Sequence, residues 1–121
     1  FIKDEDLCLQ TDDTLLQRLL FNIIENAIKY NNENGSIEII TKKEKCNTII
    51  EISDTGIGMT DEQKERIFDL FYQADYSRSG EGFGIGLALS KEIVDSLGAK
   101  ITVLDNKSSG STFVISFLTE N

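Results

Sequence analysis

Glycines are the first residues in this 121-residue chain whose type and spacing could do chemistry. Six of the nine glycines fall into two clusters, one formed by Gly56 and Gly58 and the other by Gly80, Gly82, Gly84 and Gly86. The second cluster runs directly into an expected helix, where backbone N–H groups and the positive end of the helix dipole favour an anion. A loop that simply precedes a helix explains the same pattern, and the standard phosphate-loop and dinucleotide fingerprints do not fit.

A polar stripe along another expected helix is the second candidate. At about 100° per residue, Asn22, Asn26 and Lys29 lie within about 60° of one another, beside the apolar face of that helix. Amide and ammonium groups at the edge of a core are costly unless something pairs with them. Asparagine oxygens suit a divalent cation, and a lysine suits a phosphate chain. A half-solvated polar shoulder is the alternative interpretation of each residue taken singly.

Asp54 is the third candidate, because of its place in an alternating strand. A strand period of two puts Asp54 on the same side as Ile50 and Ile52, so its carboxylate is expected to point toward the helix-covered face of the sheet. A carboxylate there needs hydrogen-bond donors, and the exocyclic amine of a purine is one. The alternative is that Asp54 merely begins the turn before Gly56.

Hydrophobic periodicity predicts the elements that must position these residues. Helices are expected over residues 12–31, from 60 to about 68, and from Gly84 or Gly86 to 97. Strands are expected over residues 36–43, 48–54, 99–104 and 111–118, with a weak edge strand over 7–11. Thr60 and Gln63 have the spacing of a helix-capping box, and Gly98 stands where a left-handed residue ends a helix. The order predicts one α+β domain, with helices on one face of a mixed sheet.

The composition excludes several classes of function. The chain has no histidine, which removes Ser-His and Cys-His nucleophile pairs and His-ligated zinc. Its formal net charge of −9 argues against binding to nucleic acid or to an anionic membrane surface. A small anionic ligand stays compatible with this charge if a divalent cation and a few local positive groups accompany it.

Three further features of the sequence concern the redox state of its cysteines, membrane spans and the extent of the chain. Cys8 and Cys46 fit no metal-ligand spacing and are expected to be reduced thiols. No run approaches the roughly 18 apolar residues of a membrane-spanning helix. The chain begins at Phe1 without a methionine, so we expect it to be part of a longer protein.

Taken together, these residues resemble the catalytic and ATP-binding domain of sensor histidine kinases, in the Bergerat-fold ATPase superfamily. Five motifs of that family occur in the family's order: the N box over residues 22–30, the G1 box over 54–59, the F box over 67–72, the G2 box over 82–88 and a last glycine motif over 110–113. The resemblance runs from about residue 12 to residue 117. It implies a two-layer α/β sandwich with a mostly antiparallel sheet, a single catalytic domain over residues 1–121, and an ATP lid over about 72–83.

The resemblance also implies roles for individual residues. Asn26 would coordinate Mg²⁺, Asn22 would orient phosphate or metal-bound water, and Lys29 would contact the phosphates. Asp54 would accept a hydrogen bond from the adenine amine. Further contacts to the nucleotide would come from other residues of these motifs and from the lid, namely Tyr30, Gly56, Ile57, Gly58, Phe71, Arg78, Gly82, Gly84, Gly86, Leu87 and Thr112.

Three positions depart from the family pattern or from its hydrolysing branches. Gln73 stands where the F box often has arginine, and Glu81 stands where a glycine is common in the G2 region. An acidic residue beside the triphosphate either weakens binding or faces solvent, and both interpretations stay open. Asn22 stands where the ATP-hydrolysing branches have a glutamate that activates water. Because asparagine is a poor base, rapid autonomous hydrolysis is not expected.

The function implied by the resemblance is that of an ATP-dependent protein histidine kinase. Its acceptor would be a histidine on a separate dimerisation domain of the same protein, and a response regulator would act downstream. This chain has no histidine, so it is not expected to phosphorylate itself. The expected setting is a cytoplasmic domain of a membrane-anchored sensor kinase, without nucleic-acid or direct membrane contact. A protein serine kinase of the anti-sigma-factor type and a non-catalytic nucleotide-sensing module are the alternatives.

Overall fold

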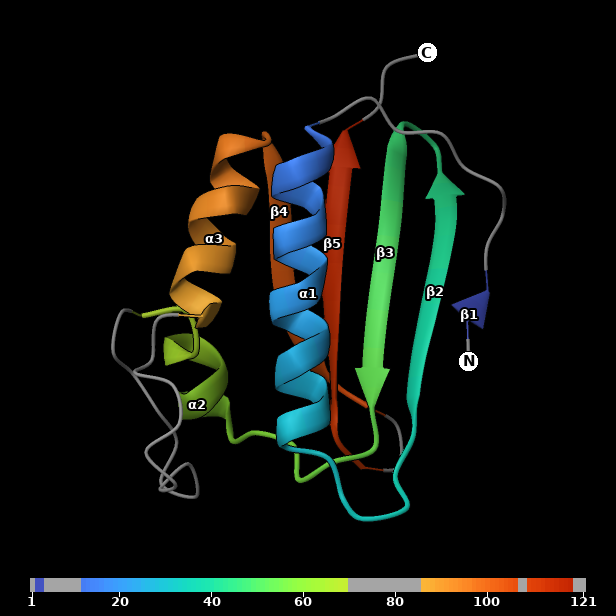
Figure 1. The fold of residues 1–121 in the computed structure, drawn as a ribbon, viewed down its shortest axis with the longest axis vertical. Helices are drawn as coiled ribbons and strands as arrows, with labels where there is room; N and C mark the ends of the chain where they lie inside the picture. The colour runs from blue at the N-terminus through green and yellow to red at the C-terminus, as the bar shows by residue number, and fades with distance from the viewer. Residues whose placement is uncertain (1, 4–11, 70–85, 107–108, 119–121) are drawn as a thin grey trace.

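A sheet of five strands and three helices makes up the part of the chain that the computed structural model describes, residues 2–3, 12–69, 86–106 and 109–118 (Figure 1). The helices are α1 (Asp13–Lys29), α2 (Asp61–Arg66) and α3 (Gly86–Ser96). The strands are β1 (Ile2–Lys3), β2 (Ile37–Glu44), β3 (Asn47–Asp54), β4 (Ala99–Asp105) and β5 (Ser111–Leu118). Their order in the sheet is β1-β2-β3-β5-β4, so the last described strand along the chain, β5, lies inside the sheet.

The helix α1 forms because its apolar residues recur on one side. Leu19, Ile23 and Ala27 follow one another at four-residue steps and are almost completely buried. The carboxylate of Asp12 caps the first turn by accepting a hydrogen bond from the N–H of Leu15 at 3.0 Å. The helix ends at Lys29, and the N–H of the next residue, Tyr30, donates to the carbonyl of Asn26 at 3.2 Å. The polar stripe therefore lies on the second half of a well-anchored helix.

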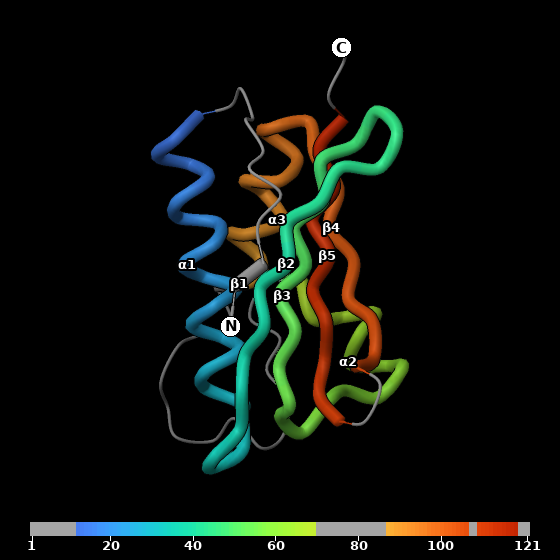
Figure 2. The backbone as a smooth tube through the Cα atoms, turned by 90° about the vertical axis from the view of Figure 1, so that its right-hand side faces the viewer, coloured from blue at the N-terminus to red at the C-terminus, as the bar shows by residue number. Residues whose placement is uncertain are grey.

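The sheet is mixed and mostly antiparallel. β1 pairs with β2 in parallel, and the other neighbouring strands pair antiparallel. Along β3 the buried side chains alternate with half-buried ones, and the buried side chains are Thr48, Ile50, Ile52 and Asp54. Ile50 and Ile52 share one hydrophobic core with residues of α1 and α3, two helices that lie next to each other on one side of the strands (Figures 1 and 2). The prediction of an α+β fold with helices on one face of a mostly antiparallel sheet is confirmed.

Helix ends follow the sequence signals closely. The Thr60 hydroxyl accepts from the N–H of Gln63 at 3.1 Å, and the Gln63 side chain accepts from the N–H of Thr60 at 2.9 Å, so the predicted capping box is present. Gly98 follows α3 with a φ of +71°, as predicted. The two-residue strand β1 was not predicted, because two residues show no periodicity. The expected edge strand over residues 7–11 lies outside the described residues.

Candidate functional site

Four segments that are far apart in the sequence meet at one end of the sheet. They are the last turn of α1, the loop that leads to β2, the turn after β3, and the turn between β4 and β5 (Figure 1). Backbone hydrogen bonds join them directly. The N–H of Ile57 donates to the carbonyl of Tyr30 at 3.3 Å, and the N–H of Thr55 donates to the carbonyl of Ser36 at 3.2 Å. The N box and the G1 box are therefore in direct contact through their backbones.

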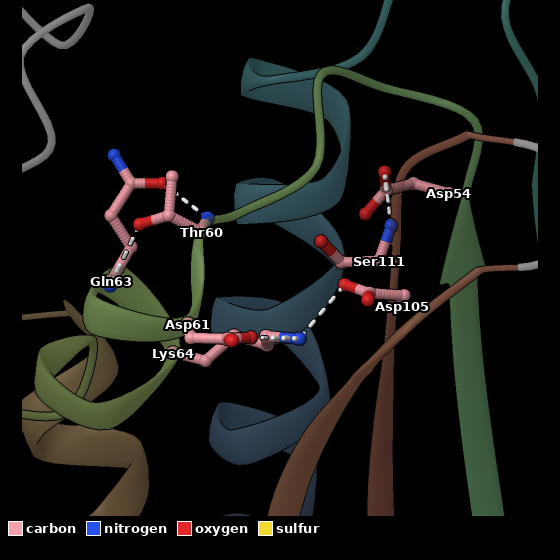
Figure 3. A network of polar contacts seen from close by, with 7 residues as sticks. All are labelled: Asp54, Thr60, Asp61, Gln63, Lys64, Asp105 and Ser111. Atoms are coloured by element: carbon pink, nitrogen blue, oxygen red, sulfur yellow. Dashed lines mark hydrogen bonds and ion pairs between the residues drawn. The ribbon is translucent and has the colours of Figure 1, made fainter.

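Asp54 is the buried acid of this site, with 6% of its surface exposed. Its Oδ1 accepts hydrogen bonds from the N–H of Gly56 at 2.9 Å and from the N–H of Ser111 at 3.3 Å, the second of which is drawn in Figure 3. Within the described residues, the hydrogen bonds of this carboxylate all end on Oδ1. One oxygen is therefore fixed by the backbone, and Oδ2 is left as an acceptor for a donor from a ligand.

Burial of the Asp54 carboxylate raises its pKa above the ordinary value of 3.8, although the N–H groups of Gly56 and Ser111 act in the opposite direction. A carboxylate at this depth loses hydration, and two backbone donors restore part of it. The alternation along β3 also places Asp54 on the same face as Ile50 and Ile52. The sequence-based prediction of its direction is confirmed.

Two glycines are required because the chain passes very close to itself here. A Cβ at Gly56 would overlap with the carbonyl oxygen of Tyr30, and a Cβ at Gly110 would overlap with the carbonyl oxygen of Asp54. Gly110 also has a φ of +93°, in the left-handed region that favours glycine. Their presence is explained by packing within the protein, while contact of Gly56 with a nucleotide stays a prediction.

The polar stripe on α1 occupies the border between core and solvent. Asn22 and Asn26 are half-buried, and Lys29 is exposed. The Nζ atom of Lys29 lies 5.3 Å from the centroid of the Tyr30 ring, within the range of a cation–π contact. The three side chains thus lie as the periodicity predicted, beside the apolar face.

Thr112 lies on the other side of the strands from the Asp54 carboxylate. Its hydroxyl is 2.8 Å from that of Ser53, and neighbouring residues of a strand point to opposite faces. The structure therefore does not bring the Thr112 hydroxyl and the Asp54 carboxylate together. Ser111, which was not predicted, reaches Asp54 through its backbone N–H.

The short helix α2 is fastened to the end of β4 by Lys64, beside this site (Figure 3). Its Nζ atom lies 2.9 Å from the Oδ1 of Asp105 and 3.3 Å from the Oδ1 of Asp61. The hydrogen bond to Asp105 raises the pKa of Lys64. After α2, the ring of Phe68 packs edge-on against that of Phe113, with centroids 6.2 Å apart. The start of the F box is therefore held against the core.

Comparison with known proteins decides the family. Residues 11–121 match the model of the family described as Histidine kinase-, DNA gyrase B-, and HSP90-like ATPase. The chain belongs to this ATPase family. The sensor protein CiaH of Streptococcus pneumoniae serotype 4 is 42% identical over 107 residues, which cover 87% of this chain and 24% of that protein. The ATPase domain therefore spans about a quarter of the length of this curated relative.

Solved structures show the same architecture as this ATPase domain. The catalytic domain of histidine kinase ThkA matches with a TM-score of 0.82 and 28% identity, over 98% of this chain and 75% of that one. A structure of ThkA in complex with the response regulator protein TrrA matches with a TM-score of 0.79 and 26% identity, over 99% of this chain and 33% of that one. Membership of this family implies that the domain binds ATP. Within the described ranges, no helix is long and apolar enough to cross a membrane.

Several predicted residues of the ATPase site lie outside the described residues. They are Phe71, Arg78, Gly82 and Gly84, together with Gln73, Glu81 and the expected lid over residues 72–83. Of the described ones, Gly86 begins α3, Leu87 packs against the core, Ile57 is 52% exposed, and Gly58 has a φ of +75°. The roles of all these residues toward a nucleotide stay predictions.

Polar residues that were not predicted from the sequence hold the turn around Asp54. The Nδ2 of Asn106 donates to the carbonyl of Asp54 at 2.8 Å, and the Oγ of Ser109 donates to the carbonyl of Gly56 at 2.7 Å. Asn31 and Asn32, directly after the N box, are likewise not among the predicted site residues. The tendency of Asn and Ser side chains to bond to backbone groups in turns was the available signal.

Proposed function

We propose that this domain binds Mg-ATP and donates the γ-phosphoryl group to a histidine on a separate dimerisation domain of a sensor histidine kinase. The observation that carries the nucleotide part is the buried Asp54 carboxylate, in which two backbone N–H groups hold Oδ1 and no donor from the described part of the chain occupies Oδ2. The kinase part is supported by the names of the relatives and of the solved structures, which are sensor proteins and histidine kinases.

At the base end, Asp54 accepts a hydrogen bond from the exocyclic amine of adenine. The amine is a donor, and the ionised carboxylate is an acceptor without a competing proton. Because the carboxylate is buried, this hydrogen bond is stronger than it would be in water. A base with a carbonyl at the same position would place two acceptors against each other, so the site discriminates between purines.

At the phosphate end, the polar stripe of α1 holds the charged part of the ligand. The Asn26 amide oxygen is a suitable ligand for Mg²⁺, and its half-buried position limits the number of conformations it adopts. Asn22 lies one turn earlier and orients phosphate or metal-bound water, while the exposed ammonium of Lys29 reaches the phosphates. The G2 residues Gly82, Gly84 and Gly86, with Arg78 of the lid, complete this end of the proposed site.

The transfer step needs positioning more than a strong base. A ring nitrogen of the acceptor histidine attacks the γ-phosphorus, the N–P bond forms, and the bond to the β–γ bridging oxygen breaks as ADP leaves with the electron pair. Because the transition state is loose, neutralisation of charge on the phosphoryl oxygens provides most of the catalysis. Asn22 does not activate water, so the γ-phosphate is kept for the histidine.

The proposed partners follow from the missing nucleophile. The chain has no histidine, so the acceptor lies on another domain, and we assign it to a dimerisation domain of the same protein in the cytoplasm. A response regulator acts downstream, and the structure of ThkA in complex with the response regulator protein TrrA supports such a partner. We also propose that the whole protein is a membrane-anchored sensor kinase, of which this domain is a cytoplasmic part.

Two measurements test this function. With labelled ATP and Mg²⁺, the chain alone is expected to stay unlabelled, and addition of the dimerisation domain is expected to give acid-labile phosphohistidine on that domain. Acid-stable phosphoserine on a partner, or phosphate on this chain, would contradict the proposal.

The second measurement is titration calorimetry of ADP with Mg²⁺ on Asp54→Asn. Loss of a hydrogen bond to a charged acceptor is expected to weaken ADP by about 10- to 100-fold. The matched control is Asp95→Asn, at an exposed ion pair with Lys91 on α3, which is expected to leave affinity unchanged. Unchanged ADP affinity in Asp54→Asn would refute the role of this carboxylate.

A further inference from the structure

The loop between α1 and β2 is tied to Thr55, the residue that follows the buried acid. The Nδ2 of Asn32 donates to the carbonyl oxygen of Thr55 at 2.8 Å. The N–H of Ser36 donates to the Thr55 hydroxyl at 2.9 Å, and that hydroxyl donates to the Oδ1 of Asn31 at 3.1 Å. The backbone and side chain of Thr55 are therefore both bonded to this loop.

The peptide between Thr55 and Gly56 connects the loop to the Asp54 carboxylate. Its carbonyl oxygen accepts from Asn32, and its N–H donates to the Oδ1 of Asp54 at 2.9 Å. A peptide group is planar, and its C=O and N–H point in opposite directions. A side chain that holds the carbonyl therefore also sets the direction of the N–H.

This peptide needs such a restraint because it is followed by a glycine. Gly56 has access to conformations with either sign of φ, so its own backbone does not prevent rotation of the peptide. Among the residues that the structure describes, the other side-chain donor to the Thr55 carbonyl is the Oγ of Ser109, at 3.5 Å. That hydroxyl lies much closer to the carbonyl of Gly56, at 2.7 Å, and is engaged there. Asn32 is thus the principal side-chain restraint on the Thr55 carbonyl.

Asn31 holds Asn32 in place. The Oδ1 of Asn31 accepts from the N–H of Asn32 at 2.8 Å, and its Nδ2 donates to the carbonyl of Ser36 at 3.0 Å. Both atoms of the Asn31 amide are used within the loop, which brings the next side chain over the turn after β3.

We propose that Asn32 is a positioning residue for recognition of the adenine amine, acting on the Asp54 carboxylate through the Thr55–Gly56 peptide. This inference rests on the proposed role of Asp54 as the acceptor for adenine. Asn32 touches no atom of the base. It holds the peptide whose N–H fixes Oδ1, and thereby keeps Oδ2 directed at the ligand.

Comparison of two nucleotides in Asn32→Ala tests this role. ADP has the exocyclic amine, and inosine diphosphate has a carbonyl in its place. In titration calorimetry with Mg²⁺, Asn32→Ala is expected to weaken ADP by roughly three- to tenfold and to change inosine diphosphate by less than about twofold. The control Glu33→Ala, at an exposed residue of the same loop, is expected to change neither. An equal loss for both nucleotides in Asn32→Ala would mean that Asn32 is merely structural and would overturn the inference.

A double variant separates this inference from the proposed function. The quantity to compare is the ratio of the affinity for ADP to the affinity for inosine diphosphate. In the Asp54→Asn background, Asn32→Ala is expected to leave this ratio unchanged, because the carboxylate that Asn32 positions is absent. A further fall of the ratio would overturn the inference. If Asp54→Asn itself leaves the ratio at its original value, the proposed function fails instead. Should Asn32→Ala not fold, Asn32→Asp keeps the shape but removes the donor, and it must lower the ratio in the same way.

Discussion

The connections at the two ends of the sheet differ in the contacts that they make with the rest of the chain. At one end, β2 and β3 are joined through Lys45 and Cys46, which are both exposed, and Lys45 has a φ of +54°. At the other end, the turn between β4 and β5 reaches across to the end of β3 and bonds to the carbonyls of Asp54 and Gly56. A connection that only reverses the chain needs a suitable backbone conformation. A connection that shapes a site needs side chains that bond to a third segment.

The two ends also differ in the free-energy cost of the groups that they bury. The hairpin end keeps its charged residues in water, whereas the site end buries the Asp54 carboxylate and two close backbone contacts. Buried ionised groups are tolerated when donors surround them, and here the backbone supplies the donors. Substitutions at the site end are therefore expected to lower the unfolding free energy and the ADP affinity. A substitution at the hairpin end is expected to have a smaller effect on the unfolding free energy, with the opposite sign.

The largest effect is expected for Gly110→Ala. The new Cβ would overlap with the Asp54 carbonyl, and residue 110 has a left-handed backbone that disfavours a side chain. Relief of the overlap must displace the end of β3. We expect a loss of unfolding free energy of roughly 2–4 kcal/mol and loss of measurable ADP binding. Gly98→Ala is the control, because Gly98 has a φ of +71° and no atom within 4 Å of its Cβ position among the described residues. Denaturant unfolding that shows equal losses in the two variants would contradict this explanation.

The second prediction concerns pH. The pKa of Asp54 is raised by burial, so the carboxylate takes up a proton at a pH above its ordinary 3.8. ADP requires the ionised form, so its affinity is expected to fall as the pH decreases from about 7 to about 4. In Asp54→Asn, the ADP phosphates still titrate, but the part of the pH dependence that comes from the Asp54 carboxylate is absent. Parallel pH profiles for the two proteins in calorimetry would exclude Asp54 as the titrating group.

Stability is expected to change in the opposite direction from affinity. Between 3.8 and the raised pKa, the folded state binds more protons at Asp54 than the unfolded state does. The contribution of Asp54 to the unfolding free energy therefore increases as the pH falls through this window, because the cost of the buried charge is removed. Comparison of chemical unfolding with that of Asp54→Asn isolates this contribution, and a decrease with falling pH would contradict it.

A smaller effect is expected for Ser109→Ala. This change removes the donor to the Gly56 carbonyl at 2.7 Å and leaves a half-buried acceptor without it. We expect a loss of about 1 kcal/mol of unfolding free energy and weaker ADP binding by a few-fold. Ser96→Ala, at the exposed end of α3, provides the matched control and is expected to be neutral. Thermal unfolding with identical midpoints for both variants would show that the Ser109 contact contributes nothing.

The smallest effect is expected at the hairpin, with a reversed sign. Lys45 has a left-handed backbone that costs energy for a residue with a Cβ, so Lys45→Gly is expected to raise the unfolding free energy by about 0.5 kcal/mol. ADP affinity is expected to stay the same, because the hairpin lies at the end of the sheet away from Asp54 (Figure 1). A change in ADP affinity in Lys45→Gly would contradict the conclusion that only the end of the sheet with Asp54 takes part in nucleotide binding.

Most of the fold was predictable because its signals are local. The periodicity of α1, the alternation along β3, the capping box at Thr60 and the glycine after α3 each depend on residues within a few positions of one another. The sequence also indicated the inward direction of Asp54, since that direction follows from its strand neighbours.

The remaining parts of the site depend on contacts between distant segments. Ser111 meets Asp54 only because β5 pairs with β3, and Asn32 reaches Thr55 only because the loop after α1 folds over the end of the sheet. Neither contact leaves a periodic pattern in the sequence. The face of Thr112 follows from its pairing with Ser53, which is likewise a property of the assembled sheet.

The strand order has a consequence for synthesis of the protein. β5 is the last described strand along the chain, yet it lies between β3 and β4, and its first residue gives Asp54 a donor from 57 positions further along. A chain emerging from the ribosome therefore has the acid and the N box long before it has this donor. Pairing at such sequence separation is slow to form. Because a ligand that binds only the folded state stabilises it, nucleotide is expected to act on the nascent domain only after β5 has been released and paired.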